Sequence, residues 1–588
     1  MANLTRNEAI ELLSSPGSRL EVTTADIRGV DYQVPNADVK ILHDLYASGA
    51  FNDDMTFLVY EDERYSYLDT YLKSANFAWR LQEQFGIKKG DSVAIASRNY
   101  PEWCLAFMAI TSIGAIAVAL NAWWNSDELK YGLQDSNARL VIADQERLER
   151  IRHLVPSLNI PVIAIRPVKS GSNEEPDIST LLNGDQTAAP DVEILPDDDA
   201  MIMYTSGSTG KPKGVVSSHR AIMTPLFAWA YIGLIDLFTL LPKEDLEPFK
   251  QWLFKETDSL PTIDPDLDTN QPPPQESSIL TYPMFHISGV VVQFLFSMLL
   301  SRKLVLMYKW DPEKALELIE QEHITVFEGV PTLSWELINS PDFEKRDTST
   351  LQTLGAGGAK RPVEQAKQIQ NKFKKDGANA GYGLTETNGL GTGISGGDYA
   401  QRPASVGRPT APLLEVEIRD EQNNALPPNQ DGEICIKSCA LFRGYWKQPQ
   451  ATAEVLRGGW LYTGDIGHLD EEGFLYITDR AKDIVIRGGE NISCAEVEEA
   501  LYEHPAVFEA AVFGLPDERL GEILGATVML RHDQTVEEDE LIKYVESRIA
   551  KFKVPAMIWL QHNQLPRLAT GKIDKRRLKQ EAASFIKT

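Results

Sequence analysis

The chain has 588 residues, which is too long for a single hydrophobic core and predicts two or more domains. Its formal net charge of −27 disfavours nucleic acid as a partner, because phosphate backbones require a basic face, and it also disfavours simple electrostatic docking to anionic lipid. If the substrates are anionic, positive charge must therefore be concentrated locally.

The four cysteines are scattered without metal-ligand spacing, and Cys435 and Cys439 are expected on a strand and its exit. Nothing in the sequence indicates disulfides or a signal peptide, which predicts a cytoplasmic protein. The run 104–124 is the only membrane-span candidate, but Gly114 and turn residues divide it into a buried helix and a strand over 115–120. We therefore expect no transmembrane segment. Peripheral membrane contact and a homodimer remain possible.

The first half of the chain alternates between helix and strand patterns. Residues 1–50 are predicted to form a helical lead-in. The other expected elements are a hairpin over 57–67, helices over 68–85, from Pro101 and from Asp127, and strands over 92–96 and 140–143. This alternation indicates a largely parallel α/β sheet. Residues 168–190 and 242–277 are irregular, and we interpret the second stretch as a solvated insertion, with a lid or a partner surface as alternatives.

The most informative segment is Tyr204–Gly214, with the sequence Tyr-Thr-Ser-Gly-Ser-Thr-Gly-Lys-Pro-Lys-Gly. A buried strand is expected before it and a helix from His219, so we predict a strand, a small-residue loop and a helix. Glycines let the backbone approach an anion, while amides, hydroxyls and lysines supply donors and charge. The segment is not a Walker loop, because Pro212 follows Lys211. We interpret it as a phosphate cradle, with a flexible polar linker as the alternative.

This segment resembles the phosphate loop of the adenylate-forming enzymes, which comprise acyl-CoA synthetases, firefly-type luciferases and peptide-synthetase adenylation domains. Further motifs in family order extend the resemblance from about residue 50 to 580. The resemblance implies a large N-terminal α/β domain with layered sheets over 1–481 and a small, mobile C-terminal α+β domain over 482–588. It also implies ATP, Mg²⁺ and CoA. The implied phosphate-loop contacts are Thr205, Ser206, Gly207, Ser208, Thr209, Gly210 and Lys211.

Four later segments resemble nucleotide contacts of the family. Gly355–Ala359 resembles the adenine-contacting turn, which assigns Gly357 to the base, although Ala359-Lys360 departs from the family pattern. In Gly381–Thr387 the resemblance implies that Tyr382 stacks on adenine, Thr385 bonds the phosphate and Glu386 holds Mg²⁺. These roles suit a flat ring, a hydroxyl and a hard oxygen ligand. Asp465, expected after a tight turn, and Arg480 are assigned to the ribose.

The acyl site is assigned from two further positions. Tyr282–Gly289 resembles the segment that borders the acyl pocket, so His286 is expected to line it, with a satisfied core histidine as the alternative. Acetate-activating relatives carry Trp at the position of Gly383. We therefore expect the missing side chain to leave the pocket floor open, unless the glycine is needed only for a positive φ.

The C-terminal part resembles the mobile domain of the family. Lys482 is assigned to the hinge, and Gly488 and Gly489 to the glycine loop that serves thioester formation with CoA. Lys572, in Leu565–Ile573, matches the catalytic lysine that reaches the carboxylate and the α-phosphate. A helix capped by Ser493, strands over 510–513 and 526–530 and a helix over 537–550 are expected, and the basic residues 575–579 are predicted to form a solvated tail.

The resemblance implies an ATP-dependent acyl-CoA ligase. A carboxylate would attack the α-phosphorus of ATP to give acyl-AMP, the small domain would rotate, and the CoA thiol would attack the mixed anhydride. A medium or long chain, or a ring, is expected on the acid. The alternatives are a stand-alone adenylation enzyme that loads a carrier protein, a luciferase-type monooxygenase and a non-catalytic nucleotide-binding protein.

Overall fold

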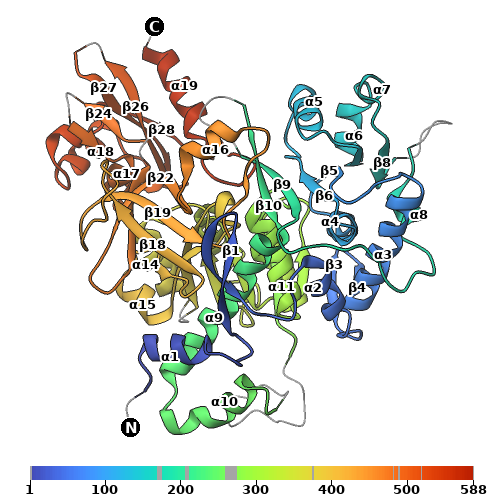
Figure 1. Cartoon of the computed structure of the whole chain (residues 1–588). Coiled ribbons are helices and arrows are strands. Elements are labelled where there is room, and N and C mark those ends of the chain that lie inside the picture. Colours follow the sequence, from blue (N-terminus) through green and yellow to red (C-terminus); the bar gives the residue numbers. More distant parts are fainter. Residues whose placement is uncertain are drawn as a thin grey trace.

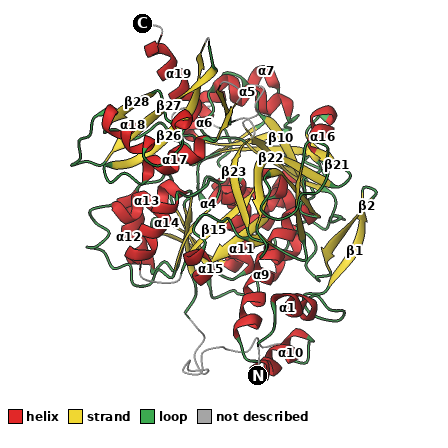
Figure 2. Ribbon diagram, turned by 90° about the vertical axis from the view of Figure 1, so that its left-hand side faces the viewer, coloured by secondary structure: helices red, strands yellow, loops and turns green. Residues whose placement is uncertain are grey.

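The computed structural model describes residues 3–168, 175–205, 211–257, 274–373, 377–480, 483–487, 490–517 and 519–586. The chain forms a large N-terminal part and a small C-terminal lobe, which lies at the upper left of Figure 1. Strands occupy the interior and helices cover them (Figure 2). The expected class, a large α/β domain with layered sheets and a small α+β domain, is confirmed.

The first sheet of the large domain carries the segment 204–214, which is called the phosphate segment below. Its seven strands follow the order β20-β10-β9-β6-β5-β7-β8, and β9, β6, β5, β7 and β8 are mutually parallel. Both faces of such a sheet are covered, and every residue of β5, β6 and β7 is buried. The strands are β5 (Ser92–Ala96), β6 (Ile116–Ala119), β7 (Leu140–Asp144), β8 (Val162–Ile165), β9 (Asp199–Thr205), β10 (Lys213–Ser218) and β20 (Gly444–Tyr445).

The second sheet carries residues 355–359, which are called the adenine turn below, and residues 381–387, which include Tyr382. Its nine strands follow the order β17-β16-β15-β14-β13-β11-β12-β3-β4. The strands are β3 (Thr56–Tyr60), β4 (Glu63–Ser66), β11 (Ser277–Leu280), β12 (Lys303–Leu306), β13 (Val326–Gly329), β14 (Thr353–Ala356), β15 (Ala378–Gly383), β16 (Gly391–Ser395) and β17 (Arg408–Pro409). The predicted hairpin near residue 60 is confirmed as β3 and β4.

Helices connect and cover these two sheets. They are α2 (Leu42–Gly49), α3 (Tyr67–Glu83), α4 (Pro101–Ser112), α5 (Ser126–Asp135), α6 (Gln145–Ile151), α7 (Val155–Leu158), α8 (Ile178–Leu181), α9 (His219–Leu240), the π-helix η2 (Ser288–Leu295), α11 (Phe296–Leu299), α12 (Pro312–Glu322), α13 (Pro331–Asn339), α14 (Val363–Phe373), the 3₁₀ helix η3 (Thr385–Thr387) and α15 (Gly396–Gln401). The predicted helices from Pro101 and near Asp127 are confirmed as α4 and α5.

A third, antiparallel sheet completes the large domain. It contains β18 (Leu414–Arg419), β19 (Gly432–Ser438), β21 (Leu456–Arg457), β22 (Trp460–Leu469) and β23 (Leu475–Arg480), with α16 (Pro449–Val455) between β20 and β21. Cys435 lies in β19 and Cys439 follows it, as expected, and all four cysteines are free and buried.

The small domain folds around its own sheet. Its strands are β24 (Val485–Arg487), β25 (Glu490–Ile492), β26 (Val507–Asp517), β27 (Gly521–Leu530) and β28 (Met557–Gln561), and its helices are α17 (Cys494–Tyr502), α18 (Glu538–Glu546), η4 (Lys551–Lys553) and α19 (Lys575–Ile586). Ser493 caps α17, as predicted. The predicted basic tail is instead a helix, and its Lys575 pairs with Glu498 at 2.5 Å.

The phosphate segment does not lead directly into a helix. β9 ends at Thr205, and β10 returns antiparallel beside it with Lys213 opposite Thr205. The predicted strand–loop–helix order is therefore wrong, because Val215 and Val216 are β-branched, fully buried and extend the sheet before α9 begins. The N-terminus of α9 lies at the far end of β10 from the phosphate segment, so the helix dipole does not assist anion binding there.

The N-terminal region is only partly the predicted helical lead-in. α1 (Arg6–Leu13) and α2 are helices, but β1 (Val22–Ile27) and β2 (Val30–Pro35) form a hairpin. Arg28 and Gly29 at its turn have φ of 59° and 80°, a combination that favours a two-residue hairpin and that the sequence reading missed.

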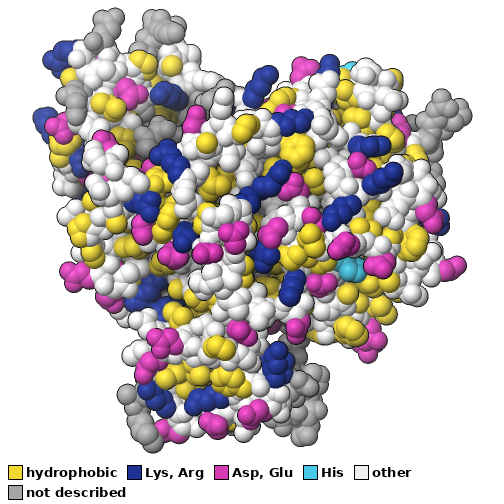
Figure 3. Space-filling view, viewed as in Figure 1, with side chains coloured by type: hydrophobic (Ala, Val, Ile, Leu, Met, Phe, Trp, Pro, Cys, Tyr) yellow, Lys and Arg dark blue, Asp and Glu magenta, His cyan; other side chains and the backbone are white. Residues whose placement is uncertain are grey.

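The start of the predicted insertion is helical and packs on the N-terminus. η1 (Lys243–Leu246) and α10 (Glu247–Leu253) form a small apolar cluster with α1 and the end of α9, at the bottom of Figure 1. Residues 258–273 of the insertion lie outside the described residues. On the face shown in Figure 3, acidic and basic side chains are intermixed over this unit and over the large domain.

A different helix from the predicted one is the membrane-span candidate of the described residues. The run 104–124 forms buried α4 and then β6, as predicted. The 22-residue helix α9 is instead long and apolar enough to cross a membrane, although 56% of its apolar window is buried inside the protein. Burial of this kind is the ordinary situation of a core helix, so the length and apolarity of α9 are weak evidence for a membrane span.

Candidate active site

Tyr382, Asp465 and Arg480, all assigned to the nucleotide from the sequence, form one connected group. The Tyr382 hydroxyl donates to Asp465 Oδ2 at 2.6 Å, and Arg480 Nε lies 3.0 Å from Asp465 Oδ1. Asp465 lies within β22, opposite Arg480 of β23, rather than after a tight turn as expected. Burial, and then the charge of Asp465, raise the pKa of Tyr382, which keeps its hydroxyl a donor. Each carboxylate oxygen has a further lone pair, so Asp465 can also accept hydrogen bonds from the hydroxyl groups of a ligand.

The adenine turn follows β14 and consists of small residues. The Gly357 carbonyl accepts a hydrogen bond from the Tyr282 hydroxyl at 3.3 Å, and Gly358 has φ of 80°. Lys360, where the sequence departs from the family pattern, donates to the Ile477 carbonyl at 3.2 Å and so links this turn to β23. The turn is therefore attached to β23, the strand that ends in Arg480.

Lys572 reaches this turn from the small domain. A Cβ built on Gly358 would lie 3.5 Å from Lys572 Cε and 3.7 Å from Nζ. The charge of Lys572 also acts on His286. Three segments that are far apart in the sequence therefore meet at one place, and all three were assigned to the active site from the sequence.

His286 is half-buried and is held in its neutral form. Its Nδ1 accepts a hydrogen bond from the Ser288 amide at 3.3 Å, which places the ring proton on Nε2, and the ring stacks on Tyr282 with centroids 6.5 Å apart. Burial, and then the charge of Lys572, lower the pKa of His286 to about 3. His286 can therefore donate one hydrogen bond but cannot act as a cation near neutral pH.

Glu386 provides a carboxylate beside the phosphate segment. Its Oε1 accepts a hydrogen bond from the Tyr445 hydroxyl at 2.8 Å, and Lys213 Nζ lies 4.9 Å from the Tyr445 ring. Thr385 shares the short helix η3 with it. Mg²⁺ in nucleotide sites is held by one or two carboxylates together with phosphates, so a single glutamate at this place fits such an ion. Within the described residues there is no cluster of three or more His, Cys, Asp or Glu side chains that could hold a metal ion.

Several predicted site residues lie outside the described part of the chain: Ser206, Gly207, Ser208, Thr209, Gly210, Lys482, Gly488 and Gly489. The flanking residues are described. Thr205 ends β9, and Lys211 Nζ lies 5.6 Å from the Tyr131 ring. β24 and β25, which flank Gly488 and Gly489, pair with each other.

Gly383 does not leave an open pocket floor. A Cβ built on Gly383 would lie 2.2 Å from the carbonyl oxygen of Gly389, so backbone already fills the space that was expected to be open to the acid. The alternative of a positive φ is also wrong. A Cβ on Gly389 would touch Val292 and Trp229 at 3.4 and 3.7 Å. Trp229 and Val292 therefore lie against Gly389, and no motif in the sequence pointed to either.

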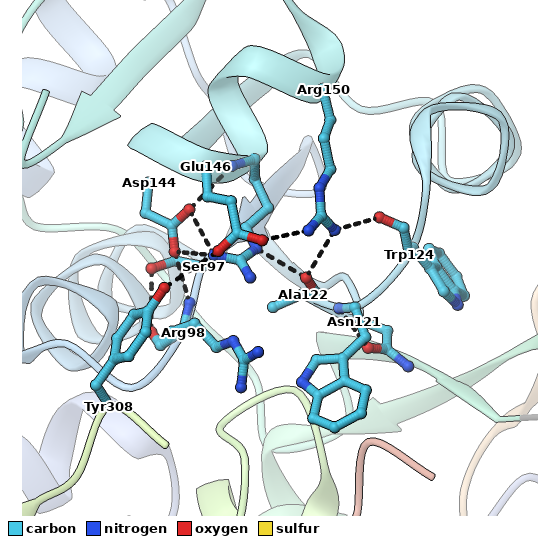
Figure 4. Close-up of polar contacts among 11 residues, drawn as sticks. Ser97, Arg98, Asn121, Ala122, Trp124, Asp144, Glu146, Arg150 and Tyr308 are labelled. Carbon is cyan, nitrogen blue, oxygen red and sulfur yellow. Dashed lines mark hydrogen bonds and ion pairs between the residues drawn. The ribbon is translucent and has the colours of Figure 1, made fainter. Parts of the chain in front are cut away.

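A cationic and aromatic cluster, also missed from the sequence, lies at the carboxyl ends of β5, β6 and β7 (Figure 4). The Arg98 guanidinium lies 5.1 Å from the Trp123 ring and 5.5 Å from the Tyr308 ring, and its buried Nε has no hydrogen-bond partner among the described residues. Asp144 accepts from the Arg98 amide and pairs with the fully buried Arg147 at 3.0 Å. β9 is parallel to β6, so this cluster and the phosphate segment share one edge of the sheet, where ligands of open α/β sheets bind.

The lowered pKa values of His219 and His286 predict that the stability of the fold depends on pH. His219 is fully buried, its Nδ1 accepts from the Leu42 amide at 3.3 Å, and burial lowers its pKa to about 4. Below the ordinary histidine pKa of 6.5 the unfolded chain binds a proton at His219 and His286 that the folded chain does not bind until its own lower pKa is reached. The free energy of unfolding is therefore expected to fall by about 1.4 kcal/mol per pH unit for each histidine as pH drops from 6.5 toward 4.

Urea unfolding at pH 8, 6 and 5 measures this effect. In His219→Asn, the asparagine Oδ1 can replace Nδ1 as the acceptor. The slope of the unfolding free energy against pH should then correspond to one proton fewer taken up on unfolding. An unchanged slope would show that His219 does not titrate in this way.

The sequence matches the family described as AMP-binding enzyme over residues 46–446 and the AMP-binding enzyme C-terminal domain over residues 496–572. Among curated proteins, it is 30% identical over 584 residues to a long-chain-fatty-acid–CoA ligase of Bacillus subtilis, covering 94% of this chain and 96% of the relative. It is 33% identical over 515 residues to a 2-succinylbenzoate–CoA ligase of Geobacillus kaustophilus, covering 87% and 92%.

The fold is similar to that of a solved Mycobacterium tuberculosis fatty acyl CoA synthetase. The TM-score is 0.67 at 28% identity, and the match covers 93% of this chain and 99% of the solved chain.

Proposed function

The chain belongs to the AMP-binding enzyme family, and from that premise we propose that it activates a medium- or long-chain carboxylic acid, or one bearing a ring, for transfer to CoA. As an AMP-forming acid–thiol ligase, it uses ATP and CoA as substrates. The observation that carries the proposal is that Lys572 of the small domain lies beside Gly358 and that its charge acts on His286.

The arrangement supports the first half-reaction in particular. Lys572 would place its charge beside the carboxylate and the α-phosphate, where charge develops as the acid attacks phosphorus. Tyr382 would stack on adenine, while Asp465 and Arg480 would hold the ribose. The neutral His286 would donate a hydrogen bond from Nε2 to the acid without adding charge. Glu386 with Thr385 would hold Mg²⁺, which neutralises phosphate charge when bound.

The second half-reaction would follow rotation of the small domain. We propose the domain boundary at 481/482, because β23 ends at Arg480 in the third sheet and β24 begins at Val485 in the sheet of the small domain. Gly488 and Gly489 would then serve the CoA thiol. A carrier protein in place of CoA, or a luciferase-type oxidation, remains an alternative for the acyl-AMP. A cytoplasmic location and a homodimer remain predictions.

The test is a panel of carboxylic acids assayed for pyrophosphate and AMP release with and without CoA. Formation of the CoA thioester at a rate that matches pyrophosphate release supports the proposal. Acyl transfer to a carrier protein without CoA, or light emission with a luciferin, would assign the chain to one of the alternatives.

We expect Trp229 to set the chain length. Its indole lies against the position of Gly389, whose carbonyl fills the space beside Gly383, and it packs edge-on to Phe296 with centroids 5.3 Å apart. Each additional buried methylene contributes about 0.8 kcal/mol, so kcat/KM should rise several-fold per carbon until the pocket is full. In Trp229→Ala the optimum should move to longer acids.

The measurement is kcat/KM from acetate to dodecanoate for the wild type, Trp229→Ala and the conservative control Trp229→Phe. A wild-type optimum at acetate would contradict the proposed substrate class. An unchanged profile in an active Trp229→Ala enzyme would show that this indole does not bound the acyl pocket.

A further inference from the structure

One face of α13 receives the small domain. Trp335 and Glu336 lie three and four residues after Thr332 on this helix of the large domain, so each is a neighbour of Thr332 on the helix surface. Thr332 Oγ1 donates to the Gly571 carbonyl at 3.1 Å, and the Trp335 ring lies 5.8 Å from that of Phe508. The contact at Gly571 is next to Lys572 in the sequence.

Glu336 makes the polar contacts of this face. Its Oε1 accepts from Gln564 Nε2 at 2.7 Å and from Arg567 Nη2 at 3.2 Å, and both donors belong to the small domain. Its Oε2 accepts from Trp310 Nε1 of the large domain at 2.7 Å. The Glu336 side chain is only 13% exposed, so solvent screens its ion pair weakly. Trp310 therefore orients a carboxylate whose other oxygen holds two groups of the small domain.

Arg567 also forms an ion pair within its own domain. Its Nη2 lies 2.5 Å from Glu509 Oε1, and the Glu509 side chain is fully buried in the small domain. The Glu509 pair can persist when the small domain turns, whereas the Glu336 contacts cross the domain boundary and have to break. Glu336 thus acts only in the arrangement seen here.

A short rigid turn connects Arg567 to Lys572. Arg567 and Ile573 form a β-bridge, the Leu568 amide donates to the Lys572 carbonyl at 2.8 Å, and the Gly571 amide donates to the Leu568 carbonyl at 2.9 Å. Gly571 has φ of 83°, and a Cβ there would lie 3.1 Å from Val330. A shift of Arg567 is therefore transmitted to Lys572.

We propose that Glu336 is a positioning residue that fixes the Lys572 turn on the large domain for acyl-AMP formation and is not used in thioester formation. The inference rests on the proposed function. Misplacing a catalytic group by a fraction of an ångström lowers the rate of the step it serves without weakening substrate binding. Glu336→Gln retains a bond to Trp310 or Gln564 but removes the charge that faces Arg567.

The test measures the two half-reactions separately in Glu336→Gln. Acyl-AMP formation is followed by single-turnover pyrophosphate release, and thioester formation is followed from supplied acyl-AMP and CoA. We expect kcat for acyl-AMP formation to fall about 10-fold at an unchanged KM for ATP, with thioester formation unaffected or faster. The matched control is Glu322→Gln: its side chain is 12% exposed and pairs with Arg64 and Lys303, all within the large domain. This control should leave both rates unchanged.

A double-mutant cycle with Lys572→Ala decides whether Glu336 acts through the lysine. If it does, adding Glu336→Gln to Lys572→Ala should cause little further loss. A full further loss, an equal fall in both half-reactions or an active variant with no loss would each overturn the inference. A wild-type enzyme that releases no pyrophosphate with any acid would overturn the proposed function itself, a result distinct from these three.

Discussion

Replacing Lys572 with alanine is expected to slow acyl-AMP formation about 100-fold, equivalent to about 3 kcal/mol of transition-state stabilisation, while thioester formation from supplied acyl-AMP continues. The reason is geometric. Lys572 Nζ lies beside Gly358 of the adenine turn, and its charge acts on the half-buried His286, so under the proposed function it would serve chemistry at the α-phosphate in this arrangement of the domains. After rotation of the small domain it would no longer face the nucleotide.

The measurement again separates the half-reactions, by pyrophosphate release without CoA and by thioester formation from acyl-AMP. Lys579→Ala is the matched control, because this lysine lies on α19 of the same domain, is 44% exposed and has Glu522 at 3.9 Å as its ion-pair partner. It should leave both rates unchanged. Equal loss of both half-reactions in Lys572→Ala would contradict a role confined to the first step.

The site residues that could be predicted from the sequence belong to short motifs that resemble those of the adenylate-forming enzymes, and their roles were carried over from that resemblance. Tyr382, Asp465 and Arg480 were assigned separately, and the structure joins them through two contacts. Such motifs are readable because backbone conformation and residue type within a few positions determine what they can bind. The fold class could be predicted for the same reason, since alternating apolar runs define strands and helices locally.

Other features depend on contacts between distant segments. Glu336 is one charged residue on an amphipathic helix, and its partners Gln564 and Arg567 lie more than two hundred residues away. The Arg98 cluster is assembled by the order of three parallel strands. β10 was missed because Val215 and Val216 fit a strand or a buried helix start equally well until β9 and β20 are seen to pair with them.

Gly383→Trp is expected to prevent correct folding rather than to shorten the accepted acid. β15 ends at Gly383, and the chain turns back so that the Gly389 carbonyl oxygen lies 2.2 Å from where a Cβ would be, with its carbonyl carbon at 2.7 Å. Both are backbone atoms and cannot move aside as a flexible side chain could. Even Gly383→Ala should cost about 2–3 kcal/mol of stability, and the indole of Trp should cost more.

The control for this prediction is Gly393→Ala in the neighbouring strand β16, where a Cβ would meet nothing within 4 Å and φ is not positive. Its free energy of unfolding should stay within about 0.5 kcal/mol of the wild type or rise slightly. Urea unfolding of the three variants, followed by circular dichroism, measures the order expected: Gly393→Ala most stable, then Gly383→Ala, then Gly383→Trp. A folded Gly383→Trp enzyme with wild-type stability and a preference for acetate would show instead that the turn at Gly389 can open, and that the position does form a pocket floor.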